Sequence, residues 1–351
     1  MKTFTLRETN IAKGVACILL LVHHLFYNSE RFDMFYHIFG IDNPPVIYVL
    51  AKLSKVCVAI FVILSGYGLT KSFKKGEQSK GWFTYKHFVK LFCQYWFIFI
   101  IFVPLGFVLG KNPIEIYGGG YKGLIKCLID FCGLANLCGT PTMNVTWWYM
   151  GAVIILYAIF PFLFRQVEKQ PIVMLLIAAI ISIFGTVTGM LYHAIVAWIL
   201  PFVMGIFLAH TEMLDKIVNT KHKYFVPFIS FAMIIAFAVI RLLMRDPIKM
   251  DTFFGLSIII FTVSFLSRLK YVDVALQFIG IHSANIFMMH TFIYYYYFKR
   301  LIYAAYYPIL ILLVLLISSL IVSMGLERLK ILVRYDRLST ILLYVGERVF
   351  K

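Results

Sequence analysis

The chain has 351 residues, of which 62% are apolar or aromatic and only 14% are charged. Soluble domains carry roughly 25% charged residues, so this composition excludes a soluble, disordered, coiled-coil or disulfide-scaffold protein. The net charge is +17, but Lys and Arg fall in short runs between long apolar stretches, which disfavours nucleic-acid binding. The composition predicts a polytopic membrane protein that is embedded in the lipid bilayer.

Ten apolar stretches are long enough to cross the bilayer, since about 30 Å of hydrocarbon takes roughly 20 residues. We expect spanning helices near 11–27, 56–73, 87–110, 146–165, 171–191, 194–210, 224–243, 252–267, 276–298 and 304–326. A tight hairpin at 191–193 would join the fifth and sixth helices. The sequence thus predicts an all-α bundle of about ten transmembrane helices, forming a single domain over residues 1–351.

The distribution of the cations predicts the orientation. If the N-terminus is cytoplasmic, about two-thirds of the 33 Lys and Arg residues fall on the cytoplasmic side. Arg31, Lys111 and Arg241 are among those expected outside. Lys13 and two histidines interrupt the first apolar stretch and no small-residue cleavage site follows, so we expect a retained span and not a signal peptide. Both termini should therefore face the cytoplasm from the cell membrane.

The first helix carries the clearest functional signal. Lys13 and His24 are eleven residues apart, which places them on one helix face about 16 Å apart along the axis. Asn10 lies one turn before Lys13, while His23 points about 100° away. Ionisable groups inside spans are costly and therefore mark candidate sites, although snorkelling of Lys13 and a hydrogen bond from His24 to a neighbouring helix are the structural alternatives.

Three further segments contain polar or small residues within apolar surroundings. Ser65, Gly66 and Tyr67 lie in the second span, where small residues allow close helix packing. The aromatic residues 147–149 before the fourth span are typical of an interfacial belt. In the ninth span, His282 and His290 are about two turns apart on one face, with Asn285 close to that stripe. No Asp or Glu lies well inside a predicted span, which disfavours ion-coupled transport.

The six cysteines do not indicate a metal site. Cys17, Cys57 and Cys93 lie in or beside spans, as buried thiols commonly do. Cys127, Cys132 and Cys138 share one external loop, which leaves open a disulfide between two of them. No His or carboxylate stands at ligand spacing from them, so we expect no metal.

Taken together, four motifs resemble the membrane-bound acyltransferase family 3, bacterial O-acyltransferases that modify cell-surface glycans. They are Lys13-x10-His24, Phe61-Val-Ile-Leu-Ser65-Gly66-Tyr67, Trp147-Trp148-Tyr149 and Gly280-Ile-His-Ser283-x6-His290. Lys13 stands where most members have Arg, and Asn10 where many have Asp. The resemblance implies that acyl-CoA enters from the cytosol, that an extracytoplasmic acceptor receives the acyl group, and that His24 is catalytic.

The residues themselves suit this reaction. A hydroxyl that attacks a thioester needs a general base, for which His24 is the candidate. The donor is expected to be acetyl-CoA, whose phosphates need cations. We expect these cations to be Lys13 and a basic stretch on the cytosolic side, namely Lys71, Lys74, Lys75, Lys86 and Lys90. The alternative for this stretch is a solvated cytoplasmic surface without a binding role. Candidates for lining the cavity or stabilising the oxyanion are Asn10, Ser65, Tyr67, Trp148, Tyr149, Ser283, Asn285 and His290.

Three function classes therefore compete, of which a purely structural membrane subunit is disfavoured by the aligned Lys13 and His24. The leading prediction is an integral-membrane O-acyltransferase that uses acyl-CoA and a surface saccharide. The alternative is a membrane carrier or exporter of an amino acid or surface polysaccharide. The aligned Lys13 and His24 favour the enzyme, and the lack of intramembrane carboxylates disfavours an ion-coupled carrier.

Overall fold

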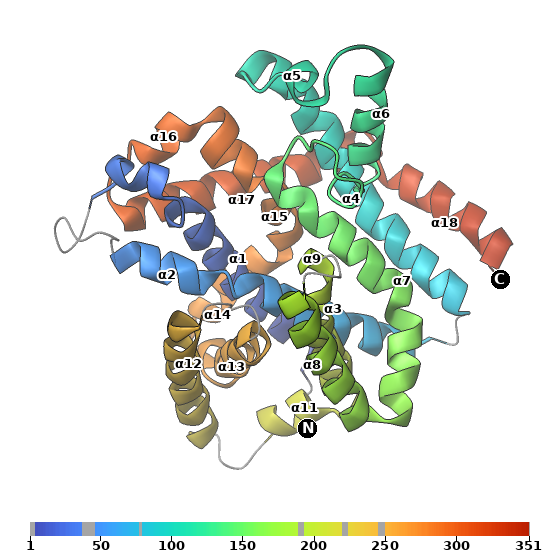
Figure 1. The fold of residues 1–351 in the computed structure, drawn as a ribbon, viewed down its shortest axis with the longest axis vertical. Coiled ribbons are helices and arrows are strands. Elements are labelled where there is room, and N and C mark those ends of the chain that lie inside the picture. Colours follow the sequence, from blue (N-terminus) through green and yellow to red (C-terminus); the bar gives the residue numbers. More distant parts are fainter. Residues whose placement is uncertain are drawn as a thin grey trace. The chain divides into compact units, whose positions relative to one another are not determined.

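The computed structural model describes residues 4–36, 46–76, 79–188, 193–219, 224–244 and 250–350. Every regular element in these ranges is a helix, as Figure 1 shows. The predicted all-α class is confirmed.

Seven helical segments in these ranges are long and apolar enough to cross a membrane. They are α1 (Leu6–Phe26), α2 with α3 (Val46–Ser54 and Cys57–Lys74), α4 (Lys80–Leu109), α7 with its preceding turn (Val145–Lys169), α12 (Phe225–Leu243), α13 with its following turn (Asp251–Arg268) and α17 (Pro308–Leu332).

The ninth predicted span is broken. It consists of α14 (Val272–Ile281) and α15 (Ser283–Thr291), and α15 continues into a π-helix, Phe292–Tyr297. A 65° bend separates the two parts, so they form an eighth crossing only if the bent pair counts as one span.

Two of the ten predicted spans are shorter apolar helices. These are α8 (Pro171–Thr188) and α10 (Ile199–His210), with the short α9 (His193–Val196) between them. The hairpin expected at 191–193 falls largely on residues outside the described ranges. All ten predicted segments are mainly helical where they are described, but only seven or eight meet the requirement for a span.

The remaining helices are short or amphipathic and lie between or after the spans. They are the 3-10 helix η1 (Ser29–Met34), α5 (Pro113–Tyr117), α6 (Gly120–Phe131), α11 (Met213–Val218), α16 (Lys299–Tyr303) and α18 (Asp336–Phe350).

The chain divides into two compact units. The first comprises Met1–His23, Tyr48–Glu77 and Ile159–Ser283, and the second comprises His24–Ile47, Gln78–Ala158 and Ala284–Lys351. Because the boundary falls at His24, the continuous helix α1 belongs to both units.

Glycines set the closest helix packing in the first unit. A Cβ on Gly66 of α3 would overlap the Phe202 carbonyl of α10, and one on Gly205 of α10 would overlap the Ile63 carbonyl of α3. The small residues of the second predicted span therefore permit close packing, as the sequence indicates.

A second close crossing joins α1 and α14. A Cβ on Gly14 would overlap the Leu276 carbonyl, and one on Gly280 would overlap the Asn10 carbonyl. An ion pair between Arg7 and Asp273 connects the same two helices. Gly280 of the ninth-span motif is thus explained by backbone packing.

Arg241, one of the cations predicted on the external side, is buried near the end of α12. Its Nε lies 2.6 Å from an Asp251 carboxylate oxygen, and each side chain is 1% exposed. One Nη also donates to the Lys52 carbonyl at 2.7 Å. A buried charge requires an oppositely charged partner, and the Arg241–Asp251 ion pair connects α12 to the start of α13.

In the second unit, α18 packs along the first turns of α4. The Tyr85 hydroxyl donates to the Leu342 carbonyl at 2.8 Å, and Gly346 leaves room for the Tyr85 ring.

All six cysteines lie in the described ranges and are free thiols, so no disulfide joins Cys127, Cys132 or Cys138 in this structure.

Candidate functional site

Helix α1 presents Lys13 and His24 as the sequence predicts. The helix runs without a break from Leu6 to Phe26, so both residues lie on one continuous helix and share one face of it. Both side chains are partly exposed, whereas most of their apolar neighbours are buried. His24 stands in the last turn, directly before η1.

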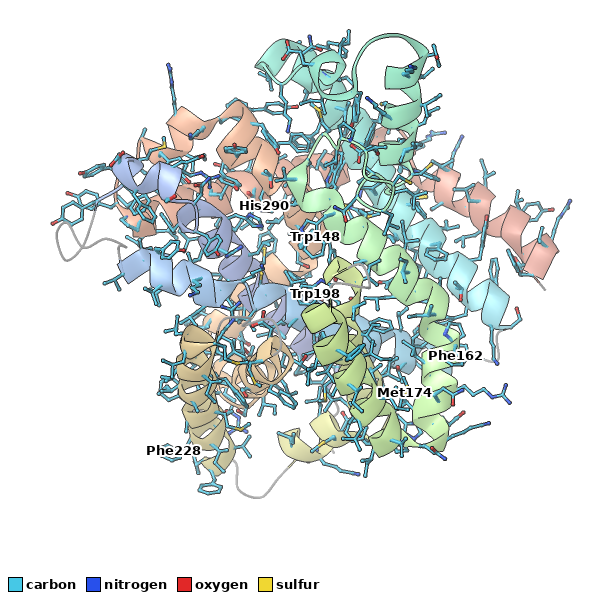
Figure 2. All side chains as sticks on the ribbon, in the orientation of Figure 1. Trp148, Phe162, Met174, Trp198, Phe228 and His290 are labelled. Carbon is cyan, nitrogen blue, oxygen red and sulfur yellow. The ribbon has the colours of Figure 1, made fainter. Side chains whose placement is uncertain are left out.

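His24 meets a second histidine in the second unit. The ring centroids of His24 and His290 are 4.9 Å apart. The Tyr294 ring completes the cluster, 5.9 Å from His290 and nearly parallel to it, and 6.4 Å from His24. Figure 2 shows His290 on α15. We call His24, His290 and Tyr294 the histidine cluster.

The hydrogen bonds of His290 fix its tautomer. Its Nδ1 lies 2.8 Å from the Ile286 carbonyl and 3.1 Å from that of Phe287. Carbonyl oxygens only accept, so Nδ1 carries the proton and Nε2 presents a lone pair. The Thr291 hydroxyl lies 3.4 Å from this Nε2. His290 is fully buried.

Arg31 lies beside this cluster, and sequence reasoning counted it only as an external cation. One of its Nη atoms donates to the His24 carbonyl at 2.5 Å. The guanidinium stacks over the rings of Tyr294 and Tyr295 at 5.1 and 4.8 Å. The Tyr303 hydroxyl donates to the Leu25 carbonyl at 2.8 Å, so α16 is also joined to the end of α1.

The segment before α7 is tied to the helix that carries His290. The Asn144 amide and the Trp147 indole both donate to the Met288 carbonyl, at 3.1 and 3.0 Å. Trp147 is 3% exposed and therefore acts as a structural anchor and not as a belt residue.

A π-helix follows α15, in which the Phe298 N–H donates to the Ile293 carbonyl five residues earlier. Such segments often occur at functional sites.

Trp148 and Tyr149, both predicted to line the cavity, begin α7 and are partly exposed (Figure 2 labels Trp148). The Tyr149 ring lies 4.9 Å from that of Phe287 on α15. These two residues therefore lie in the same unit as the histidine cluster.

Asn285 belongs to a polar network and not to the His290 face of α15. Its amide donates at 2.8 Å to Ser323 and to Glu327 of α17, and it accepts from Gln94 of α4. Lys330 joins the network through Gln94 at 2.5 Å and Glu327 at 2.8 Å.

The helix break corrects one expectation. Because the helix is broken before Ser283, His282 and His290 do not form one stripe, and Asn285 is five residues, about 140° around the helix, from His290. Helix α17 extends to Leu332, beyond the predicted end at 326, and its last turns include Glu327, whose side chain is 46% exposed.

Four other predicted cavity residues lie in the first unit, and the contacts described for them are local. Ser65 donates to the Phe61 carbonyl of its own helix, and Ser283 to the Gly280 carbonyl at the helix break. The Asn10 carbonyl faces Gly280. Tyr67 is 2% exposed, and its ring contacts that of Phe4.

The predicted donor-binding lysines are distributed over both units. Lys75 is exposed at the end of α3, while Lys86 and Lys90 lie one turn apart on α4. Two lysines of the same stretch have partners within the first unit. Lys71 forms an ion pair with Asp215 at 2.9 Å, and Lys74 donates to the His210 carbonyl at 3.2 Å.

The segment between α4 and α7 holds a buried carboxylate and a half-buried amine. Asp130 of α6 is 1% exposed and accepts from the Tyr117 hydroxyl at 2.7 Å and from the Met143 N–H at 2.8 Å. Burial raises the pKa of Asp130 against the effect of these hydrogen bonds. Burial also lowers the pKa of Lys111 to about 7, and the charge of Asp130 opposes this shift. Lys111 Nζ lies 2.9 Å from the centroid of the Tyr296 ring.

The apolar helices and the histidine cluster define a multi-pass membrane protein with a paired imidazole site. A family model described as an acyltransferase domain matches residues 7–328, so the chain belongs to acyltransferase family 3. The protein is therefore an acyltransferase, and this match favours the enzyme over the carrier. Comparisons with curated proteins and with solved structures each gave no significant match.

Proposed function

We propose that the protein moves an acyl group, acetyl in the first instance, from cytosolic acyl-CoA to a hydroxyl of an extracytoplasmic saccharide. It would do so in the cell membrane with both termini in the cytoplasm. The contact between His24 and His290 carries this proposal, because it supplies a base and a neighbouring proton acceptor at the end of α1.

In the proposed reaction, His24 is the general base. One of its ring nitrogens removes the proton as the acceptor oxygen attacks the thioester carbon. The tetrahedral intermediate then collapses, the carbon–sulfur bond breaks, and the imidazolium returns the proton to the departing CoA thiolate. The products are an O-acyl ester and free CoA, and no proton is gained or lost.

His290 would support the imidazolium that forms during this step. Its Nδ1–H is held by the Ile286 carbonyl, and the centroid of its ring lies 4.9 Å from that of His24. Two imidazoles in contact can share one added proton, which favours the protonated intermediate of the base. Fixing one tautomer of His290 lowers the reorganisation needed at that moment.

The donor would lie along α1 with its phosphates near Lys13. Eleven helical residues separate Lys13 from His24 by about 16 Å, a distance that an extended thiol arm could bridge. Lys75, Lys86 and Lys90 are further candidates for the nucleotide phosphates, since the proposed orientation would place most of the cations, including these three, on the cytoplasmic side.

The test is acetyl transfer in membranes supplied with labelled acetyl-CoA. His24→Ala should lower transfer by about 10²–10⁴-fold, the usual contribution of a general base. His23→Ala is the matched control, because its Nδ1 bonds the Ala51 carbonyl instead. Transfer at the wild-type rate in folded His24→Ala protein would refute the role of His24. Substrate movement by vesicles without CoA would instead support the carrier.

A further inference from the structure

The guanidinium of Arg31 is a buried positive charge next to the proposed base. Arg31 is 5% exposed in η1, directly after α1. It donates to the His24 carbonyl and stacks on Tyr294, one of the three residues of the histidine cluster. The charge is therefore held within the same group of side chains as the His24–His290 pair.

No acidic side chain in the described ranges forms an ion pair with this cation. The groups described around the guanidinium are neutral: one Nη donates to the His24 carbonyl, the rings of Tyr294 and Tyr295 lie against it, and among the described residues its buried Nε has no hydrogen-bond partner. A buried charge without a counter-ion costs several kcal/mol, so buried charges are normally paired. Arg31 therefore lacks the anion that its surroundings would require.

We propose that Arg31 binds an oxyanion of the acceptor, a carboxylate or a phosphate, and so holds an acidic saccharide beside His24. Arginine offers parallel N–H groups that match both oxyanions, and the buried Nε–H is the group without a hydrogen-bond partner here. This inference rests on the proposed function, since it assigns a substrate class to the same site.

The position of Arg31 on the chain points to the acceptor and not to the donor. Lys13, which we assign to the donor phosphates, lies about 16 Å from His24 toward the start of α1. Arg31 follows the opposite end of this helix and contacts the His24 carbonyl. An anion at Arg31 would thus approach His24 from the side away from the nucleotide.

Binding can be tested separately from catalysis with three sugars. Glucuronate and glucose 6-phosphate should each raise the Tm of the purified protein, and neutral glucose should not. Arg31→Gln should abolish these shifts, whereas Arg300→Gln, which removes an exposed cation from the neighbouring α16, should keep them. A response to glucuronate alone identifies a carboxylate, and one to glucose 6-phosphate alone identifies a phosphate. Equal responses to all three sugars, or to none, would overturn the proposal.

A second variant covers the case in which Arg31→Gln does not fold. Arg31→Lys keeps the charge but loses the two-pronged N–H edge, so it should bind the acidic sugars about tenfold more weakly than the wild type. Unchanged affinity in Arg31→Lys would contradict recognition by the guanidinium.

Transfer from acetyl-CoA separates this inference from the proposed function. The wild type should prefer the acidic sugar over glucose by about tenfold in kcat/KM, and Arg31→Gln should lose that preference. Acidic sugars that bind through Arg31 but are never acetylated would refute the proposed function alone. Transfer without any preference for acidic sugars would refute the role of Arg31 alone. An equal loss toward acidic and neutral sugars would assign Arg31 a purely structural role.

Discussion

His24 and His290 lie on different helices of one compact unit, with their imidazole centroids 4.9 Å apart. His24 lies in the last turn of α1, a helix that the sequence predicts clearly, whereas His290 lies on a helix after a break that the sequence does not predict. The meeting of the two rings is what turns a lone intramembrane histidine into a candidate proton-transfer site.

The first prediction concerns His290. If its Nε2 supports the imidazolium of His24, His290→Gln should lower kcat by about 10²-fold and leave the KM for acetyl-CoA unchanged. His282→Gln is the matched control, because that histidine lies at the end of α14. A raised KM with an unchanged kcat would indicate that His290 binds substrate instead.

The second prediction concerns the donor. Lys13→Glu should raise the KM for acetyl-CoA by about tenfold or more, since it places a negative charge where we expect phosphates. Lys13→Arg should remain active because it keeps the cation. Lys122→Glu on the exposed surface of α6 serves as the control. An unchanged KM in Lys13→Glu would dissociate Lys13 from the donor.

The third prediction concerns the crossing of α1 and α14. Gly280→Ala should destabilise the protein by about 1–3 kcal/mol, because the new Cβ would overlap the Asn10 carbonyl. Gly68→Ala in α3 meets nothing within 4 Å and should be neutral or stabilise by up to about 1 kcal/mol. The two Tm values in detergent check this difference, and equal shifts would contradict it.

The fourth prediction concerns the polar network. Asn285→Ala leaves Gln94, Ser323 and Glu327 with fewer hydrogen bonds and should cost about 1–3 kcal/mol of stability. Ser65→Ala removes only a bond within one helix and should cost less than about 0.5 kcal/mol. If the two variants unfold at the same temperature, Asn285 does not stabilise this bundle.

The fifth prediction is a pH dependence. The pKa of Lys111 is about 7 in the folded protein, below the usual value for lysine in the unfolded chain. Between these two pKa values the unfolded chain binds more protons, so this group makes stability rise with pH, and its full penalty applies below about pH 7.

Lys111→Met should therefore raise Tm most at about pH 6, and the gain should fade toward about pH 10. Asp130 loses its neighbouring cation in this variant, which reduces the gain. Lys122→Met, at an exposed position, should shift Tm little at either pH. A gain for Lys111→Met that is equal at both pH values would show that lost bulk or packing, and not charge, governs the effect.

Local periodicity was sufficient to predict α1 and the shared face of Lys13 and His24, because an uninterrupted helix repeats every 3.6 residues. The helix break before Ser283 was not predictable from hydropathy, since both halves are apolar. Gly280 followed by Ser283 was the available signal, as the first permits the close crossing and the second bonds a carbonyl freed at the break.

Arg31 and Tyr294 could not be found in the same way. In sequence, Arg31 is one of several external cations and Tyr294 one of four consecutive tyrosines, which is typical of a membrane interface. Their roles depend on the contact between η1 and the π-helix, which lie far apart in the chain. Burial without an acidic partner is a property of the folded protein alone.

Helix α1 also sets a fixed distance between the proposed donor-binding residue and the proposed base. Its continuity from Leu6 to Phe26 fixes the spacing of Lys13 and His24, so a single alanine inserted between them would turn His24 by about 100° and advance it by about 1.5 Å. In the proposed reaction, the helix would therefore select donors by the length of the arm between phosphate and thioester. A shortened thioester that lacks the nucleotide would lose this alignment even if the catalytic histidine were intact.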